Sequence, residues 1–165
     1  MHYILNVCGL ATTAIAFAAF APRAVAQENA FTLTCQNFGG GAPEPLGDRE
    51  GHSILVNDYS CRADSGPLSG GVWTGRAIWE WDKTNAVLVS GNGVVRKPGA
   101  TVVYQETRGK LELTMTDGKV TGFLATGGGS WPMAIGSAAS LAGKSYTWTS
   151  KPTGPGQFAV ELKVE

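Results

Sequence analysis

Hydrophobic and polar residues alternate with a period of two along much of the chain. From Trp73 to Trp81 the odd positions are apolar or small, and most positions between them are polar. The same alternation returns at residues 111–116 and 158–164. Because successive side chains of a strand point to opposite faces of a sheet, this rhythm predicts strands with one buried face.

Applied along the chain, this reasoning predicts nine strands separated by short turns. The strands are expected at Ala30–Asn37, His52–Arg62, Val72–Asp82, Ala86–Arg96, Ala100–Thr107, Lys110–Thr116, Val120–Thr126, Gly143–Ser150 and Gln157–Val164. Residues that favour tight turns separate four pairs of them, at Asp82-Lys83-Thr84-Asn85, Lys97-Pro98-Gly99, Arg108-Gly109 and Asp117-Gly118. The only helical feature expected is a single turn within Ile135–Leu141.

Strands joined by such short turns are antiparallel neighbours, so the sequence predicts an all-β antiparallel meander. Eight or nine strands in this order can close into a barrel or divide into a sandwich. We favour an eight- or nine-stranded β-barrel because closure removes the exposed sheet edges. Glycines inside the strands support it, since they let a sheet bend sharply, although a glycine can also admit a ligand close to the backbone. These glycines are Gly75, Gly91, Gly93 and Gly122.

The first residues have the pattern of a cleavable signal peptide. Residues 4–20 are almost wholly apolar and are followed by Pro22 and by small residues at Ala24 and Ala26. We therefore expect a signal peptide over residues 1–26, cleavage after Ala26, and one β-barrel domain over residues 27–165. The alternative is a membrane anchor that is retained. Cleavage predicts an exported protein, periplasmic or secreted, with no integral membrane segment.

Cysteine usage agrees with export. Cys8 lies in the predicted signal peptide, which leaves Cys35 and Cys61, and in an oxidising compartment these two are expected to form one disulfide. The alternatives are a pair of free thiols, one of them nucleophilic, or a metal site. Two cysteines and one histidine do not fill a zinc coordination shell, so neither a metal nor another cofactor is predicted.

The charge balance limits the possible partners. The chain has thirteen basic and thirteen acidic residues, whereas nucleic acids and anionic membrane surfaces attract a basic excess gathered on one face. No nucleic-acid partner is therefore predicted. The sequence leaves the oligomeric state open.

Four stretches of the chain, Leu46–His52, Trp79–Lys83, Ser90–Gly99 and Met115–Gly122, resemble an uncharacterised family of small exported bacterial proteins. The order of glycine-broken strands, with Gly127–Ser130 and then Ala142-Gly143 before an aromatic strand, more distantly resembles the allene oxide cyclase and dirigent-type barrel. That second resemblance implies an eight-stranded barrel with an apolar cavity. No catalytic residue of the cyclases can be matched to a position here.

His52 is a weak candidate for a catalytic residue, because it is the only histidine after residue 26 and Ser53 follows it directly. A hydrolase would need base, nucleophile and acid to meet in space. Adjacent residues of a strand point to opposite faces, which would separate His52 from Ser53. We therefore expect a histidine at the rim, where the strand begins, and in Asp48-Arg49-Glu50 a solvated loop held by ion pairs.

The aromatic residues are candidates for the lining of a ligand site. Three tryptophans share one strand parity, which predicts that they fill the barrel interior as core residues. If the interior is not fully packed, the same residues would border a cavity for a small apolar molecule. The candidate ligand-binding residues are Trp73, Trp79, Trp81, Tyr104 and Trp148.

Glu106 is the second weak catalytic candidate. It falls in phase with Val102 and Tyr104, which would place a carboxyl group on an otherwise apolar face and raise its pKa. It also lies near the strand end expected at Arg108-Gly109, and glutamates at strand ends are usually exposed. We expect the exposed position.

Together these features predict an exported, soluble, non-enzymatic β-barrel that binds a small apolar ligand or acts as an interaction module. One alternative is an isomerase or cyclase-type enzyme that uses Glu106 in an apolar cavity. Another is a structural protein of the cell envelope, which would have a filled interior and a broad apolar patch outside.

Overall fold

The computed structural model describes residues 30–165, and most of them lie in β-strands. The strands are β1 (Ala30–Gly40), β2 (Glu44–Pro45), β3 (His52–Ala63), β4 (Val72–Asp82), β5 (Asn85–Lys97), β6 (Ala100–Thr116), β7 (Lys119–Gly136), β8 (Ser145–Gly154) and β9 (Gln157–Val164). A single 3-10 turn, η1 (Ala139–Leu141), precedes β8 at the place expected for a helical turn. Between residues 30 and 165, no helix is long and apolar enough to span a membrane.

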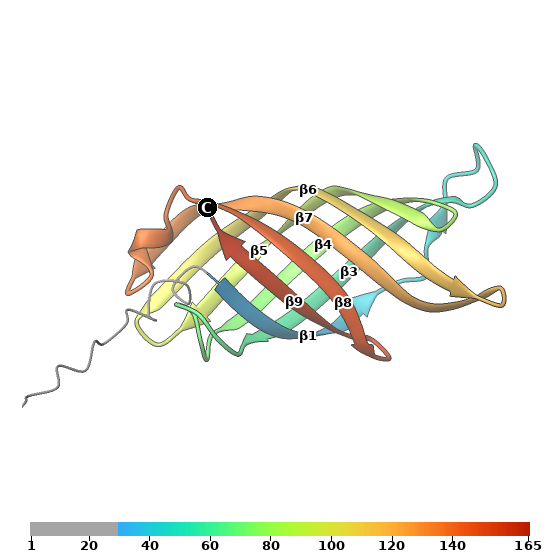
Figure 1. Cartoon of the computed structure of the whole chain (residues 1–165). Coiled ribbons are helices and arrows are strands. Elements are labelled where there is room, and N and C mark those ends of the chain that lie inside the picture. The colour runs from blue at the N-terminus through green and yellow to red at the C-terminus, as the bar shows by residue number, and fades with distance from the viewer. Residues whose placement is uncertain (1–29) are drawn as a thin grey trace, which may run out of the picture.

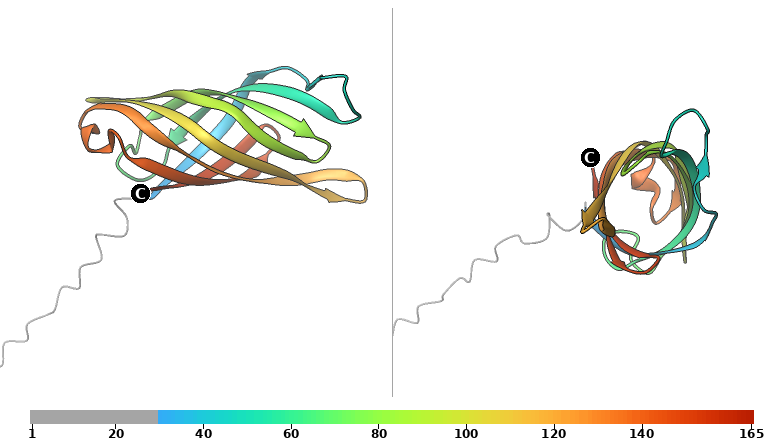
Figure 2. Two further views of the ribbon diagram at one scale, coloured as in Figure 1. Left: turned by 90° about the horizontal axis from the view of Figure 1, so that it is seen from above. Right: turned by 90° about the vertical axis from the view of Figure 1, so that its right-hand side faces the viewer.

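The sheet closes on itself. Neighbouring strands follow the order β1-β9-β8-β7-β6-β5-β4-β3, all antiparallel, and β1 also pairs with β3 to complete the ring (Figure 1). Seen end on, the strands form a continuous wall (Figure 2). The predicted β-barrel is confirmed, with eight strands in the ring. The ninth strand, the short β2, pairs with β3 at Ser53 and Ile54, beyond the residues that pair with β1.

One predicted turn is wrong. Arg108-Gly109 does not end a strand, because β6 runs unbroken from Ala100 to Thr116. The pairing between β6 and β7 instead shifts by one residue between Glu106 and Arg108, as it does at a β-bulge, where one strand carries an extra residue. Before the bulge the even-numbered residues of β6, such as Tyr104 and Glu106, face inward. After it the odd-numbered residues, such as Leu111, do so.

Strand β7 is longer than predicted. It continues past Thr126 through Gly127–Gly129 to Gly136. The glycines leave space for ring atoms from the neighbouring strand β8: a Cβ atom at Gly127 would collide with Trp148, and one at Gly129 would collide with Tyr146. This glycine run is therefore strand, and its missing side chains accommodate two large aromatic residues.

The predicted disulfide is confirmed. Cys35 of β1 and Cys61 of β3 are direct cross-strand partners, with their Cα atoms 3.9 Å apart, and their sulfur atoms are bonded. The bridge thus joins the two strands that close the ring. The predicted signal peptide, residues 1–26, lies outside the described residues.

The two ends of the barrel differ. At one end, called the closed end here, the loop after β3 supplies the buried residue Leu68, and the segment between β7 and β8 that contains η1 supplies the buried residues Ala138 and Leu141. Trp131 is fully buried there and packs against the rings of Phe31, Trp73 and Tyr146. The opposite end, called the open end, carries the turns β4–β5, β6–β7 and β8–β9. The right-hand view of Figure 2 looks into the open end, with η1 visible at the far end of the barrel.

Candidate functional site

A cavity of about 290 Å³ occupies the part of the barrel that faces the open end. Its wall is mainly apolar, and every strand of the ring except β5 contributes lining residues. The aromatic lining residues are Tyr59, Trp73, Trp79, Trp81, Tyr104, Phe123, Tyr146, Trp148 and Phe158. The sequence could not determine whether the interior is hollow, and the structure shows that it is.

The predicted ligand-binding residues all line this cavity. Trp73, Trp79 and Trp81 project inward from alternate positions of β4, Tyr104 projects from β6 and Trp148 from β8. Each is less than one tenth exposed except Trp81, which lies near the open end. The fifth tryptophan, Trp131, does not border the cavity and belongs to the packed closed end. The interior is therefore partly core and partly lining.

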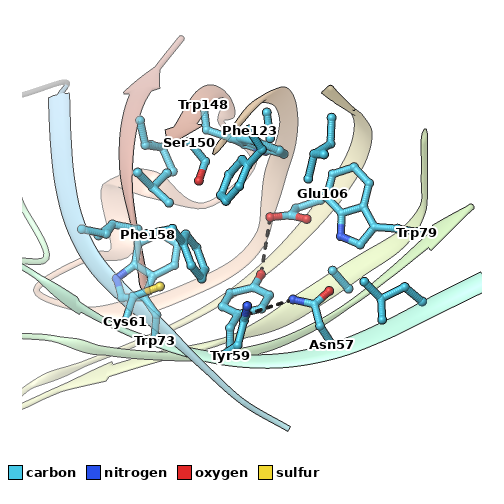
Figure 3. A pocket seen from close by; sticks show the side chains of 18 of the residues that line it. Asn57, Tyr59, Cys61, Trp73, Trp79, Glu106, Phe123, Trp148, Ser150 and Phe158 are labelled. Atoms are coloured by element: carbon cyan, nitrogen blue, oxygen red, sulfur yellow. Dashed lines mark hydrogen bonds between the residues drawn. The ribbon is translucent and has the colours of Figure 1, made fainter. Parts of the chain in front are cut away.

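Few polar side chains enter the cavity. Asn37, Asn57 and Ser150 border it, and Glu106 projects its carboxyl group into the space next to Tyr59, Trp79 and Phe123 (Figure 3). The expectation of an exposed Glu106 is wrong. Its in-phase position with Tyr104 decides its direction, since the strand end that would have exposed it does not exist.

Three hydroxyl and carboxyl groups form a chain of hydrogen bonds across the cavity wall. The Tyr104 hydroxyl donates to the Tyr59 hydroxyl over 3.0 Å, and the Tyr59 hydroxyl donates to Oε1 of Glu106 over 3.4 Å. The second carboxyl oxygen of Glu106 lies against Gly91 and accepts no hydrogen bond from the described residues. Glu106 therefore keeps most of its capacity to accept hydrogen bonds.

Glycines make this arrangement possible. Tyr59, Gly75, Gly93 and Tyr104 are consecutive cross-strand partners on β3, β4, β5 and β6. A Cβ atom at Gly75 or Gly93 would collide with the Tyr104 hydroxyl, so both positions must lack a side chain for the two phenols to meet. Gly91 gives Glu106 the same room. These glycines admit interior side chains close to the backbone, and curvature of the sheet is a second effect.

Burial changes the acidity of the groups in this cluster. Removal from water raises the pKa of Glu106 from 4.5 to about 7, and the hydrogen bond from Tyr59 only partly opposes this shift. Burial and the nearby Glu106 carboxylate also raise the pKa of the Tyr59 phenol well above its usual value. Glu106 can thus change its charge near neutral pH, while the phenol remains a hydrogen-bond donor.

The lining has only one group that becomes charged in this range. No lysine, arginine or histidine occurs among the described residues that border the cavity. The third phenol, Tyr146, comes from β8 across Gly129 and is 1% exposed. Its hydroxyl has no hydrogen-bond partner in the described part of the chain. The cavity is therefore either neutral or singly negative, according to the state of Glu106.

His52 lies away from the cavity. It is the first residue of β3 and faces outward, under the loop that precedes the strand. Its Nδ1 atom lies 2.5 Å from Asp48 and its Nε2 atom 2.9 Å from Glu80. The hydrogen bond to Asp48, followed by that to Glu80, raises the pKa of the imidazole. His52 therefore holds this loop to the outer wall, as expected for a rim histidine.

The loop before β3 is held by ion pairs, as predicted. Arg49 pairs with Asp48 at 2.8 Å and reaches Asp82 of β4 at 3.0 Å. Between residues 30 and 165, no cluster of three or more His, Cys, Asp or Glu side chains is arranged to hold a metal ion. Of the two weak catalytic candidates, Glu106 is therefore the one placed where it could act on a bound molecule.

Several lining residues were missed by sequence analysis. Tyr59, Phe123 and Phe158 were not singled out, although each lies in the inward phase of its strand. Phase along the strands could have found all three. Their convergence on one space depends on the register between strands, which the sequence alone does not give.

Comparison of the chain with protein-family models, with curated proteins and with solved structures gives no match. The resemblances to the small exported bacterial proteins and to the cyclase-type barrel therefore stay predictions.

Proposed function

We propose that this barrel binds a small, largely apolar molecule in its interior. The observation that carries the proposal is the aromatic cavity of about 290 Å³, which lies between a solidly packed closed end and an open end. Small-molecule sites are typically concave and mostly apolar, with a few polar groups that orient the ligand. The cavity has both properties, with Glu106 as the principal polar group.

The size of the space supports binding over a purely structural role. A protein whose task is only to hold the envelope together gains stability from a filled interior, because each void forfeits packing contacts. Here the closed end is packed tightly by Trp131 and its neighbours, while the adjoining half is left hollow. Some positions that point into this half carry small side chains that do not fill it, as at Ala77 and Ala125.

Binding can be tested by filling the cavity. Ala125 is buried in β7 and lines the cavity, so Ala125→Phe should occupy the space that a ligand needs. We expect the unmodified protein to bind an apolar fluorescent dye with quenching of its tryptophan emission, and the variant to bind it at least about tenfold more weakly.

The matched control is Thr126→Phe, which adds the same ring at the next residue, on the outer face of β7. It should leave dye affinity unchanged. Equal binding by the unmodified protein and Ala125→Phe would contradict the proposal, provided that circular dichroism shows both to be folded. Native mass spectrometry of protein purified from its source cell should in addition reveal a bound small molecule.

We also propose that the barrel functions outside the cytoplasm, in the periplasm or as a secreted protein. The Cys35–Cys61 disulfide supports this, since such bonds persist in oxidising compartments. Expression of the full chain in a bacterium should yield a mature protein whose N-terminus, determined by sequencing, is Gln27. An intact mass that retains residues 1–26 would refute cleavage after Ala26.

A second candidate function is acid–base catalysis of the isomerase or cyclase type. The inward position of Glu106 and its pKa of about 7 favour it, because a general acid or base works best near the ambient pH. If this is correct, a bound ligand will be converted to a product of equal mass, and Glu106→Gln will bind it without conversion. Chromatography of the ligand before and after incubation distinguishes conversion from simple binding.

A further inference from the structure

We propose that the cavity selects apolar molecules that carry one cationic amine, with the ammonium group paired to Glu106 among aromatic rings. This inference rests on the proposed binding function and names the class of ligand. It follows from the charge of the lining, from the free acceptor capacity of Glu106 and from the aromatic surfaces around it.

The first argument is the charge balance of the cavity. Glu106 is the only carboxyl group among the described lining residues, and no basic residue accompanies it. A ligand with an acidic head group would meet a like charge and no partner, which disfavours it. A cation would supply the missing opposite charge.

The second argument is that the site is preformed. Folding has already brought the Glu106 carboxyl group into the apolar interior, and one of its oxygens accepts no hydrogen bond from the described residues. An ammonium group can donate to this oxygen, and hydrogen bonds between charged groups are the stronger ones. Folding therefore already includes much of the free-energy cost of desolvating the carboxylate, and ligand binding adds less, as in other preorganised sites.

The third argument concerns the surroundings of Glu106. Its carboxyl group points into the space bordered by Tyr59, Trp79 and Phe123 (Figure 3). The faces of aromatic rings attract ammonium groups, most strongly those of tryptophan. Such rings also pack well against an apolar body. The same wall can therefore hold both parts of a hydrophobic amine.

The pH should control this selectivity. The titratable groups that face Glu106 are the phenols Tyr59, Tyr104 and Tyr146, which stay protonated in the range considered because burial raises the pKa of each. Glu106 is therefore the group that switches, and it is charged above about pH 7. Amine binding should weaken as the pH falls and the carboxylate takes up a proton.

The experiment compares three probes with the same apolar body: phenylbutylamine, phenylbutanol and phenylbutyrate. Calorimetric titration at about pH 8, where the amine is protonated and Glu106 is ionised, should give the amine at least about tenfold higher affinity than the alcohol, with the acid weakest. At about pH 5.5 the affinity for the amine should fall about tenfold, while that for the alcohol stays constant.

The variant Glu106→Gln should abolish the preference for the amine and keep the affinity for the alcohol. If the variant does not fold, the pH dependence of the unmodified protein is the deciding measurement. Equal affinity for amine and alcohol at both pH values, or tightest binding of the acid, would overturn the inference and leave the binding function intact. If none of the probes binds, both the inference and the proposed function are wrong.

Discussion

The hydroxyl groups of Tyr59 and Tyr104 lie 3.0 Å apart, although two other strands separate the strands that carry them. The contact exists because the intervening positions, Gly75 and Gly93, have no side chain and let both phenols lie over the backbone. The hydrogen-bonded cluster of Tyr104, Tyr59 and Glu106 thus depends on the absence of side chains at these two glycines.

Gly93→Ala should destabilise the barrel. The added methyl group would collide with the Tyr104 ring and with the Thr74 carbonyl oxygen, and overpacking of a tight interior costs about 1–3 kcal/mol. Chemical denaturation followed by tryptophan fluorescence measures the loss. Gly122→Ala is the control, because a Cβ atom there comes no closer than 3.6 Å to the nearest neighbour. Equal stability of the two variants would contradict the role given to Gly93.

Loss of the disulfide should also destabilise the fold. The bridge closes a loop with a sequence separation of 26 between Cys35 and Cys61, for which chain entropy gives about 3 kcal/mol. We expect the double variant Cys35→Ala/Cys61→Ala to unfold at a lower denaturant concentration than the oxidised protein. Added reductant should shift the midpoint of the unmodified protein and leave that of the double variant unchanged. A midpoint insensitive to reductant in both proteins would show that the bridge contributes little.

Glu106 should make the protein less stable as the pH rises. In the unfolded chain the carboxyl group loses its proton near its ordinary pKa of 4.5, whereas in the folded protein it keeps the proton up to about 7. Between these values the folded state binds more protons, so the free energy of unfolding decreases with pH. Across this window the loss should approach about 3 kcal/mol.

Replacing Glu106 by Gln should remove the contribution of this carboxyl group to the slope, which unfolding curves recorded from about pH 4 to about pH 8 will reveal. Glu112→Gln, an exposed position on the same strand, is the matched control and should keep it. Parallel profiles for the unmodified protein and Glu106→Gln would contradict the burial of this carboxyl group.

His52 should contribute in the same pH direction through its contacts on the outer wall. Hydrogen bonds to Asp48 and Glu80 raise the pKa of its imidazole above 6.5, so it binds a proton more tightly in the folded state. This stabilisation is fully present below about pH 6.5 and is lost as the pH rises through the folded pKa. His52→Gln should therefore cost more stability at about pH 5.5 than at about pH 8.5.

The imidazole can be titrated directly by NMR, since His52 is the only histidine after residue 26. The expected result is a pKa above 6.5 that decreases in Asp48→Asn, because this variant removes the partner with the largest effect. A pKa at or below 6.5 would argue against the contacts with both carboxylates.

Alternation of apolar and polar residues predicted the strands, and the removal of exposed edges together with the glycines inside the strands favoured the barrel over a sandwich. The range Val72–Asp82 coincides with β4 and Gln157–Val164 with β9, because in each of these strands the inward-facing residues are apolar or small and more buried than most of the residues between them. Prediction failed at Arg108-Gly109, where glycine and a change of parity occur both in turns and in β-bulges. Only the pairing with β7 distinguishes the two.

The lining of the cavity was predicted in part. Parity placed Trp73, Trp79 and Trp81 inside the barrel, and phase with Tyr104 gave the true direction of Glu106. The general preference of glutamate for exposed positions pointed the other way and was overridden by register. Whether the interior is hollow could not be predicted, because that depends on the summed volumes of side chains from eight strands.

The buried side chains of Leu68, Trp131 and Leu141 block the closed end, so the cavity is accessible from the open end. If the proposed amine binds at Glu106, it has to enter through the open end with its polar group first and leave by the same path. The bulk of the leading group is then limited by the rings it passes, while a trailing chain is free to protrude into solvent. A site of this shape would discriminate among head groups and accept tails of many lengths.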